Sequence, residues 1–343
     1  MKSKKSRFSK FGRFWKLLGP GLVTGASDDD PSGIATYSQA GAAYGLSTLW
    51  TALIAFPLMA SIQQMCAKIG LVTSQGLTGT LKKYYPRPVL YLMLLFSFPA
   101  IVLNIGADIA GMGAVGNLLF PAVDATYFSV IFTIMLLGLI IYLPYQKIAA
   151  VLKYMCIVLL VYLIVPFLYS GLVMFFIILT TGTVLFKGGI HQIDTVEQAA
   201  LALKPLAGNL AYLLFAIGVI GTGLIAIPVL SGSLSYIITE TFGWEQGLDK
   251  KFHEAKAFYV IIAISLLLGL SLNYVGISPI KALIYTAILY GLTAPVLIAI
   301  ILHISNNKKI MGDHVNGRTL NIMGFAALII MSAAAVVLLY LFI

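Results

Sequence analysis

The chain has 343 residues, of which 60% are hydrophobic and only 10% are charged, and its mean hydropathy is +0.97. Soluble domains carry about 25% charged residues, so this composition excludes a soluble globular protein and predicts an integral membrane protein. The net charge of +10 would suggest nucleic-acid binding in a soluble protein, but here the Lys and Arg residues fall in short loops between apolar runs, where they set membrane topology. We therefore expect no nucleic-acid partner and extensive contact with a lipid bilayer.

The first residues, 1–16, form a basic segment that should lie at the cytoplasmic surface, and 17–343 should form a single transmembrane domain. Residues Gly19-Pro20-Gly21 interrupt the apolar stretch that follows, which makes it a poor signal peptide, so we expect it to be retained. Alternating ten-residue segments of the barrel kind are absent, so the predicted fold class is all-α. The apolar runs predict about nine transmembrane helices, at 17–45, 48–72, 89–119, 126–144, 154–186, 209–238, 257–275, 280–304 and 320–343.

The first predicted span is unusual because the carboxylates of Asp28, Asp29 and Asp30 lie in its middle. A carboxylate at the centre of a bilayer costs about 2.5–3.5 kcal/mol, so such acids usually face a cavity, a partner or a passing ion. Pro31 removes a backbone donor and disfavours helical geometry at Asp30, and Gly33 loosens the chain beyond it. We expect a helix broken at mid-membrane; the alternative is that the acids only cap a helix that starts at Pro31.

This break predicts a cation site with oxygen ligands. Asp30 is the first candidate for a direct ligand, and Asp28 and Asp29 should raise the negative potential and bind through water. The backbone carbonyl groups of Ala26 and Ser27 are further candidates, because unwound segments expose their carbonyl oxygens. Hard oxygen ligands suit Mg²⁺, Mn²⁺ and Fe²⁺, and the sequence does not choose among these substrates.

The third predicted span contains two more polar residues, Asn104 and Asp108, among small residues that let membrane helices approach closely. Two interpretations stay open. Asp108 is either an acid on the ion or proton path, or a structural acid paired with Asn104 or with a neighbouring helix. The four histidines lie near loops or helix ends without metal-ligand spacing, and Cys66 and Cys156 lie in apolar runs, where packing is the usual role.

The basic residues predict which loops face the cytoplasm. The loops that carry Lys82, Lys250 and Lys308 should be cytoplasmic, whereas 121–125 and 187–207 should be external, which also places the carboxyl end outside. This alternation counts the uncharged run Tyr154–Phe186 as one span. One helix of that length is about 50 Å long, more than the roughly 30 Å hydrocarbon core, but two helices would be cramped. We expect one long span, kinked at Pro166.

Several motifs resemble the Nramp family of divalent-metal transporters. They are Gly19-Pro20-Gly21-Leu22-Val23, Asp30-Pro31-Ser32-Gly33-Ile34-Ala35-Thr36, Ala67-Lys68-Ile69-Gly70-Leu71-Val72-Thr73, Ala107-Asp108-Ile109-Ala110 and Pro205-Leu206-Ala207-Gly208. The resemblance covers nearly the whole chain. It implies the inverted-repeat, broken-helix transporter fold, with a substrate site at the membrane midplane.

Two departures from the family pattern affect the implied chemistry. Where the family has an asparagine ligand after the Asp-Pro break, this chain has Gly33, which carries no side-chain oxygen. Where the family has a glutamate three residues after the aspartate of the third span, this chain has Gly111, so the resemblance leaves proton coupling open. Both changes resemble the Nramp-related branch that is associated with magnesium. A wide, acid-rich site with few direct ligands suits Mg²⁺, which holds its water shell tightly.

A third departure is larger, because the family's sixth span has no counterpart here. Residues Tyr154–Pro166 resemble the start of the fifth family span and Tyr169–Phe176 the middle of the seventh, which implies an internal deletion that fuses the two. Two functions follow as hypotheses: a secondary transporter of Mg²⁺, Mn²⁺ or Fe²⁺, or a truncated, transport-inactive membrane protein that binds cations or assembles with another subunit. No phosphate loop, zinc-protease or nucleophile-elbow motif is present, so we expect neither an enzyme nor a bound cofactor.

Overall fold

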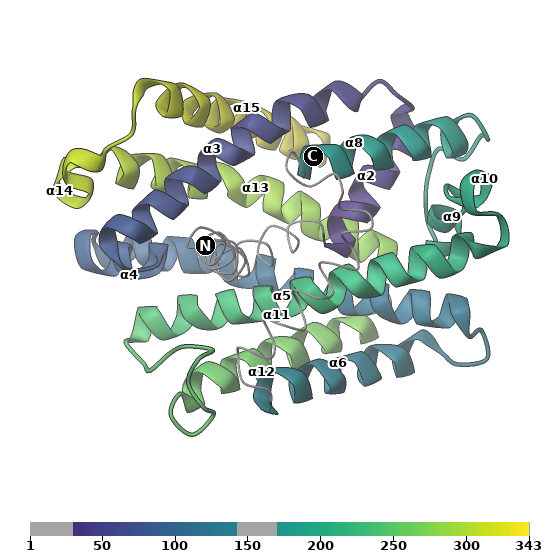
Figure 1. The fold of residues 1–343 in the computed structure, drawn as a ribbon, viewed down its shortest axis with the longest axis horizontal. Coiled ribbons are helices and arrows are strands. Elements are labelled where there is room, and N and C mark those ends of the chain that lie inside the picture. Colours follow the sequence, from purple (N-terminus) through teal and green to yellow (C-terminus); the bar gives the residue numbers. More distant parts are fainter. Residues whose placement is uncertain (1–29, 143–169, 343) are drawn as a thin grey trace, which may run out of the picture.

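A computed structural model describes residues 30–142 and 170–342. Within these ranges all regular secondary structure is helical, and loops join the helices (Figure 1). Seven helical segments are long and apolar enough to cross a membrane. Their main helices are α3 (Leu49–Thr73), α5 (Arg87–Leu119), α6 (Ala125–Tyr142), α11 (Ala211–Phe242), α12 (Lys256–Ser271, continued by η4, Leu272–Tyr274), α13 (Pro279–Asn306) and α15 (Arg318–Phe342). The shorter elements are α2 (Pro31–Tyr44), α4 (Leu77–Tyr84), α8 (Ser170–Thr181), η2 (Gly182–Phe186), α9 (Val196–Leu201), α10 (Lys204–Ala207), η3 (Gly208–Leu210), α14 (Lys308–Met311) and η5 (Gly312–His314).

The predicted spans and the helices agree closely. Seven of the predicted spans coincide with the seven membrane-length segments. The carboxyl-terminal part of the first span is α2, and that of the long fifth span is α8 with η2. The remaining parts of these two spans, 17–29 and 154–169, lie outside the described residues, and so does the predicted deletion.

The central helix of the bundle is α5, which has the largest buried share among the membrane-length helices. One side of α5 packs with α6, α11 and α12 around a core of large apolar side chains that includes Ile109, Leu136 and Phe258. We call these four helices the α5 group. Small residues set the close crossings: a methyl group added to Gly106 of α5 would lie 2.7 Å from the carbonyl oxygen of Gly269 in α12.

A second group is formed by α2, α3 and α8, together with α13 and α15, and we call it the α3 group. Met65 and Ile69 of α3 pack against Leu302 of α13 and Ala327 of α15. The helices α2 and α8 cross at a glycine, because a methyl group on Gly41 would lie 1.9 Å from Oγ1 of Thr181. The two groups meet along α5, α2 and α13 (Figure 1).

The loops sort to the two ends of the bundle as the charge pattern predicts. The loops around 82–87, 243–255 and 307–317 lie at one end, which we call the basic end, and the segments 120–124 and 187–207 lie at the other (Figure 1). At the basic end, Nζ of Lys82 donates to the carbonyl oxygen of Glu240 at 3.1 Å, and Oη of Tyr85 lies 2.5 Å from Nδ1 of His303. The relative alternation is therefore as expected, while the predicted cytoplasmic side of the basic end stays a prediction.

Candidate metal centre

The carboxylate of Asp30 lies at the start of α2, between α2 and α5. Its Oδ1 accepts hydrogen bonds from the backbone N–H of Gly33 at 2.8 Å and from Oγ of Ser32 at 2.7 Å. Asp30 is thus the N-cap of α2, and Pro31 occupies the first helical position. Capping does not use the whole group, because Oδ2 faces α5 and accepts a hydrogen bond from Nδ2 of Asn104 at 2.7 Å. Asp30 therefore caps α2 and also joins it to α5.

Glycines in two neighbouring helices let the amino-terminal end of α2 lie deep in the bundle. A methyl group on Gly111 of α5 would lie 3.8 Å from Pro31, and one on Gly223 of α11 would lie 3.6 Å from Pro31. At Gly111, the position where the family resemblance expects an acid, Leu283 of α13 also lies within 3.4 Å of such a methyl group. Gly111 carries no side chain, so within the described residues the acids of the centre are Asp30 and Asp108.

The polar residues of α5 follow one another by one helical turn and share a face. Asn104 is 1% exposed and Asp108 is completely buried. The amide of Asn104 is bonded to Asp30 and not to Asp108, so of the interpretations left open for Asp108, a structural pairing with Asn104 does not occur. Among the described residues, neither oxygen of Asp108 has a hydrogen-bond partner of normal geometry, and the backbone N–H of Ser32 lies close to this carboxyl group. Oδ1 of Asn104 likewise has no partner in the described ranges.

A fourth side chain, Tyr290 of α13, reaches the same place. Its hydroxyl oxygen is buried without a hydrogen-bond partner and lies within electrostatic reach of the carboxyl groups of Asp30 and Asp108. The sequence analysis missed this residue, because a tyrosine in an apolar span is usually a packing or interfacial residue. Nothing in the sequence around Tyr290 distinguishes it from Tyr285, which lies on the exposed surface of the same helix.

These four residues make a centre of oxygen donors. It contains two carboxyl groups, an amide oxygen and a phenol oxygen, and the four described histidines lie elsewhere, in loops or near helix ends. Buried polar groups normally have partners, and two buried carboxyl groups close together repel one another when both are charged. A divalent cation between them would remove the repulsion and give the unpartnered oxygens a ligand, so the residues fit a hard cation.

The remaining predicted ligands are not in the described part of the chain. Asp28, Asp29, Ala26 and Ser27 all precede residue 30, so their roles stay predictions. The described residues contain no cluster of three or more His, Cys, Asp or Glu side chains that could hold a metal by itself. Gly33 contributes a backbone N–H to Asp30 and no oxygen at the position where the family has its asparagine.

Comparison with known proteins identifies relatives of this chain. Residues 21–170 and 163–341 match the model of a family described as natural resistance-associated macrophage protein-like, Nramp. The divalent metal cation transporter MntH of Burkholderia ambifaria is 36% identical over 81 residues, which cover 24% of this chain and 18% of the relative. The protein of the same name from Staphylococcus aureus strain JH9 is 29% identical over 147 residues, or 42% of this chain and 32% of the relative. These matches therefore cover at most a third of each relative's length.

The fold is shared with solved structures of a manganese transporter from Eremococcus coleocola. In its complex with an aromatic bis-isothiourea compound, the TM-score is 0.69 at 16% identity, covering 94% of this chain and 87% of that one. A single-residue variant of the same transporter gives a TM-score of 0.68 over the same coverage. At this identity the likeness shows the fold, which is the broken-helix transporter architecture that the sequence predicts.

Proposed function

Because this chain belongs to the Nramp family, we propose that it is a secondary transporter that carries divalent metal cations across the cytoplasmic membrane through the centre around Asp30. One observation supports this most directly: Asn104, Asp108 and Tyr290 bring buried oxygen atoms without hydrogen-bond partners to the capped start of α2. Leaving a buried polar group unpaired costs about 1–3 kcal/mol, so an arrangement with several of them needs a ligand or a function.

The position of the centre suits alternating access. It lies where α2, from the α3 group, meets α5 and α13, and the hydrogen bond from Asn104 to Asp30 crosses that boundary. A cation bound there contacts both helix groups. Its contacts therefore change when one group moves relative to the other. Transporters of this architecture hold the substrate at such a boundary and open it to one side at a time.

The donor set favours hard cations. Carboxylate, amide and phenol oxygens suit Mg²⁺, Mn²⁺ and Fe²⁺, and the centre's described residues offer no sulfur or imidazole ligand. Mg²⁺ keeps most of its water molecules, and the unpartnered Oδ1 of Asn104 and the hydroxyl of Tyr290 are suited to accept hydrogen bonds from those waters. We place Mg²⁺ and Mn²⁺ as the first substrates to test.

The decisive experiment is cation uptake into liposomes that contain the full chain. Asp30→Asn keeps an N-cap side chain of the same shape and removes the charge, so the fold should survive while Mn²⁺ and Mg²⁺ uptake falls to that of empty vesicles. Asp124→Asn, in the exposed loop that follows the carboxyl end of α5, is the matched control and should leave uptake unchanged. Equal uptake by Asp30→Asn and the parent would remove the basis of the proposal.

The alternative is a transport-inactive protein that binds cations or assembles with another subunit. It is favoured by the expectation from the sequence that a family span is deleted within 154–186, and the two family-model matches overlap within that run, at 163–170. The same preparation separates the two functions. Binding without transport predicts that Mn²⁺ raises the melting temperature in an Asp30-dependent way, while uptake never exceeds that of empty vesicles.

A further inference from the structure

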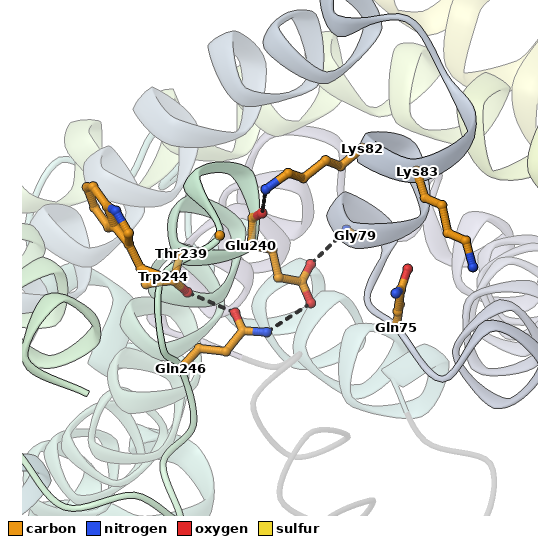
Figure 2. Close-up of a pocket in the computed structure, with 9 residues that line it drawn as sticks. Gln75, Gly79, Lys82, Lys83, Thr239, Glu240, Trp244 and Gln246 are labelled. Atoms are coloured by element: carbon orange, nitrogen blue, oxygen red, sulfur yellow. Dashed lines mark hydrogen bonds between the residues drawn. The ribbon is translucent and has the colours of Figure 1, made fainter. Parts of the chain in front are cut away.

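At the basic end, the last turn of α11 reaches across to the short helix α4 (Figure 2). Oε2 of Glu240 accepts a hydrogen bond from the backbone N–H of Gly79 at 2.9 Å. Gly79 is the third residue of α4, and the N-cap residue of α4, Gly76, has no side chain to bond the free N–H groups of the first turn. The carboxylate of Glu240 takes the place of the missing cap, and its negative charge suits the positive end of the helix dipole.

The same pair of helices is joined in the opposite direction. Lys82, in the last turn of α4, donates from Nζ to the carbonyl oxygen of Glu240 at 3.1 Å. That carbonyl belongs to the carboxyl end of α11, where carbonyl groups lack partners inside the helix and a positive charge is favourable. Each helix thus provides a hydrogen-bond partner for a backbone group at the end of the other helix. We call the Gly79, Lys82 and Glu240 contacts the α4–α11 clamp.

The surroundings are shaped for this contact and leave it accessible to water. A methyl group on Gly76 would lie 2.9 Å from both carboxylate oxygens of Glu240, so a larger residue at 76 would displace the end of this side chain from its present position. Nε2 of Gln246 donates weakly to Oε1 of Glu240 at 3.5 Å, and Oγ1 of Thr239 donates to Oε1 of Gln246 at 2.9 Å. A cavity of about 440 Å³ borders the clamp, and Trp244 lies on its wall (Figure 2). The polar contact is therefore open to water on one side, while on the other side Leu81 of α4 packs in the core with Met65 and Ile69 of α3.

The clamp crosses a connection between the two helix groups. The helix α4 lies between the two groups in the chain: it follows α3 through a turn in which Ser74 has a left-handed backbone conformation, and only Tyr85 and Pro86 separate it from α5. Since α4 packs on both α3 and α5, a relative movement of the two groups at the basic end would displace α4 and disturb its contact with α11. The centre around Asp30 lies on the same boundary, farther along the bundle.

We propose that the α4–α11 clamp is a gate contact, with Glu240 as its positioning residue, that closes the basic end and parts when a cation passes there. This inference rests on the proposed transport function. A hydrogen bond to a charged group is worth about a tenfold or larger change in a two-state population, so removing it should shift the chain strongly toward conformations open at this end. A transporter must alternate between conformations open at either end, so a strong excess of one conformation slows transport.

The conformational test uses Trp244 as a reporter. The chain has three tryptophans, so a background with Trp15→Phe and Trp50→Phe leaves Trp244 as the only one. Trp244 is already half-exposed, so in this background Glu240→Ala should raise the quenching of its fluorescence by acrylamide only modestly, by less than about twofold, as the opened clamp admits more quencher. Glu240→Gln keeps an acceptor for the N–H of Gly79 and should give an intermediate value. Glu245→Ala is the matched control, since Glu245 is an exposed residue of the adjoining loop that pairs with Lys250.

Uptake measured on the same variants completes the test. We expect Glu240→Ala to lower Mn²⁺ uptake per folded molecule about five- to tenfold with a small fall in melting temperature, because the N–H of Gly79 loses its cap, and Glu245→Ala to match the parent. Unchanged quenching in Glu240→Ala would overturn the gate, and so would increased quenching with normal uptake, which would mean local fraying only. These failures are distinct from failure of the transport proposal, which is decided by Asp30→Asn in chains whose clamp is intact. If the parent chain itself shows no uptake, both proposals fail.

Discussion

Two buried polar regions of this bundle differ in how their polar atoms are satisfied. Where α13 turns into α15, the amide groups of Asn306 and Asn321 bond one another in both directions at 2.8 Å. Asn316 donates to Asn321 at 3.1 Å and to Ser305 at 2.9 Å, which leaves only its own Oδ1 without a partner. At the centre around Asp30, both oxygens of Asp108, one of Asn104 and the hydroxyl of Tyr290 are unpartnered. We call the first region the asparagine network.

The difference separates two uses of buried polarity. A closed set of hydrogen bonds fixes one helix against another and is complete without a ligand. An open set keeps bonding capacity in reserve at a cost in stability, and a substrate can use that capacity. Changes in the asparagine network should therefore affect stability and spare transport, and changes at the centre should do the reverse.

The largest effect on transport should come from Asp108→Asn. This change removes a carboxyl group that can become a charged ligand when a cation binds and keeps the shape, so we expect Mn²⁺ uptake to fall about 100-fold while the melting temperature stays level or rises. Thermal unfolding in detergent and uptake into liposomes measure the two quantities on one preparation. A large loss of melting temperature with uptake per folded molecule retained would place Asp108 with the asparagine network as a structural residue.

The opposite result is expected for Asn321→Leu. The side chains of Asn306 and Asn316 would lose partners that are at least partly shielded from water, so the free energy of unfolding should fall by about 2 kcal/mol. Uptake per folded molecule should stay within about twofold of the parent, because these residues lie at the basic end and not at the centre. If uptake instead falls as much as it does in Asp108→Asn, the asparagine network and the centre around Asp30 do not differ in their role in transport.

A smaller effect is expected at Tyr290, where Tyr290→Phe removes one hydroxyl and keeps the ring. Uptake should fall about five- to tenfold, more for Mg²⁺ than for Mn²⁺, because the phenol oxygen would bond a water molecule that Mg²⁺ releases reluctantly. Tyr285→Phe is the control on the exposed side of the same helix. Identical uptake by these two variants would show that the unpartnered hydroxyl has no role in transport.

The smallest effect is expected at Asp124, an exposed acid that already accepts a hydrogen bond from Thr126. Hydrogen bonds from Thr126 to the carboxylate of Asp124 hold the pKa of that carboxyl below its ordinary value. A lowered pKa in the folded state contributes stability that is present above about pH 4, the unfolded value, and is lost as the pH falls through the folded value. The melting temperature should drop slightly in that acidic range, and Asp124→Asn should reduce the drop. An unchanged pH profile in Asp124→Asn would show that this loop does not contribute.

Much of the fold follows from hydropathy, because the bilayer selects long apolar helices before any packing is decided. The charge pattern likewise predicts which loops share an end. The amphipathic helix α4 was not predicted, since its eight residues fall between two spans and read as a loop. Its contacts with Glu240 join residues more than 150 positions apart, and no local pattern contains that information.

The centre was predicted only in part, for a similar reason. Asp30, Asn104 and Asp108 stand out because polar residues are rare in apolar spans, and the structure brings all three together. Which of them bond depends on how α2 crosses α5, and the sequence left open whether Asn104 pairs with Asp108, whereas in the structure it bonds Asp30. Tyr290 was missed because its role depends on the face of α13 that turns inward, and tyrosine is common on both faces of this helix.

The contact of Pro31 and Leu283 with Gly111 has a consequence for redesign of this chain. A methyl group at 111 would make only ordinary van der Waals contacts, 3.4 Å from Leu283 and 3.8 Å from Pro31. Alanine is therefore compatible with the packing at this position, whereas a longer side chain must find room beside two apolar residues. Position 111 is thus a place where added bulk can be titrated one carbon at a time next to Pro31.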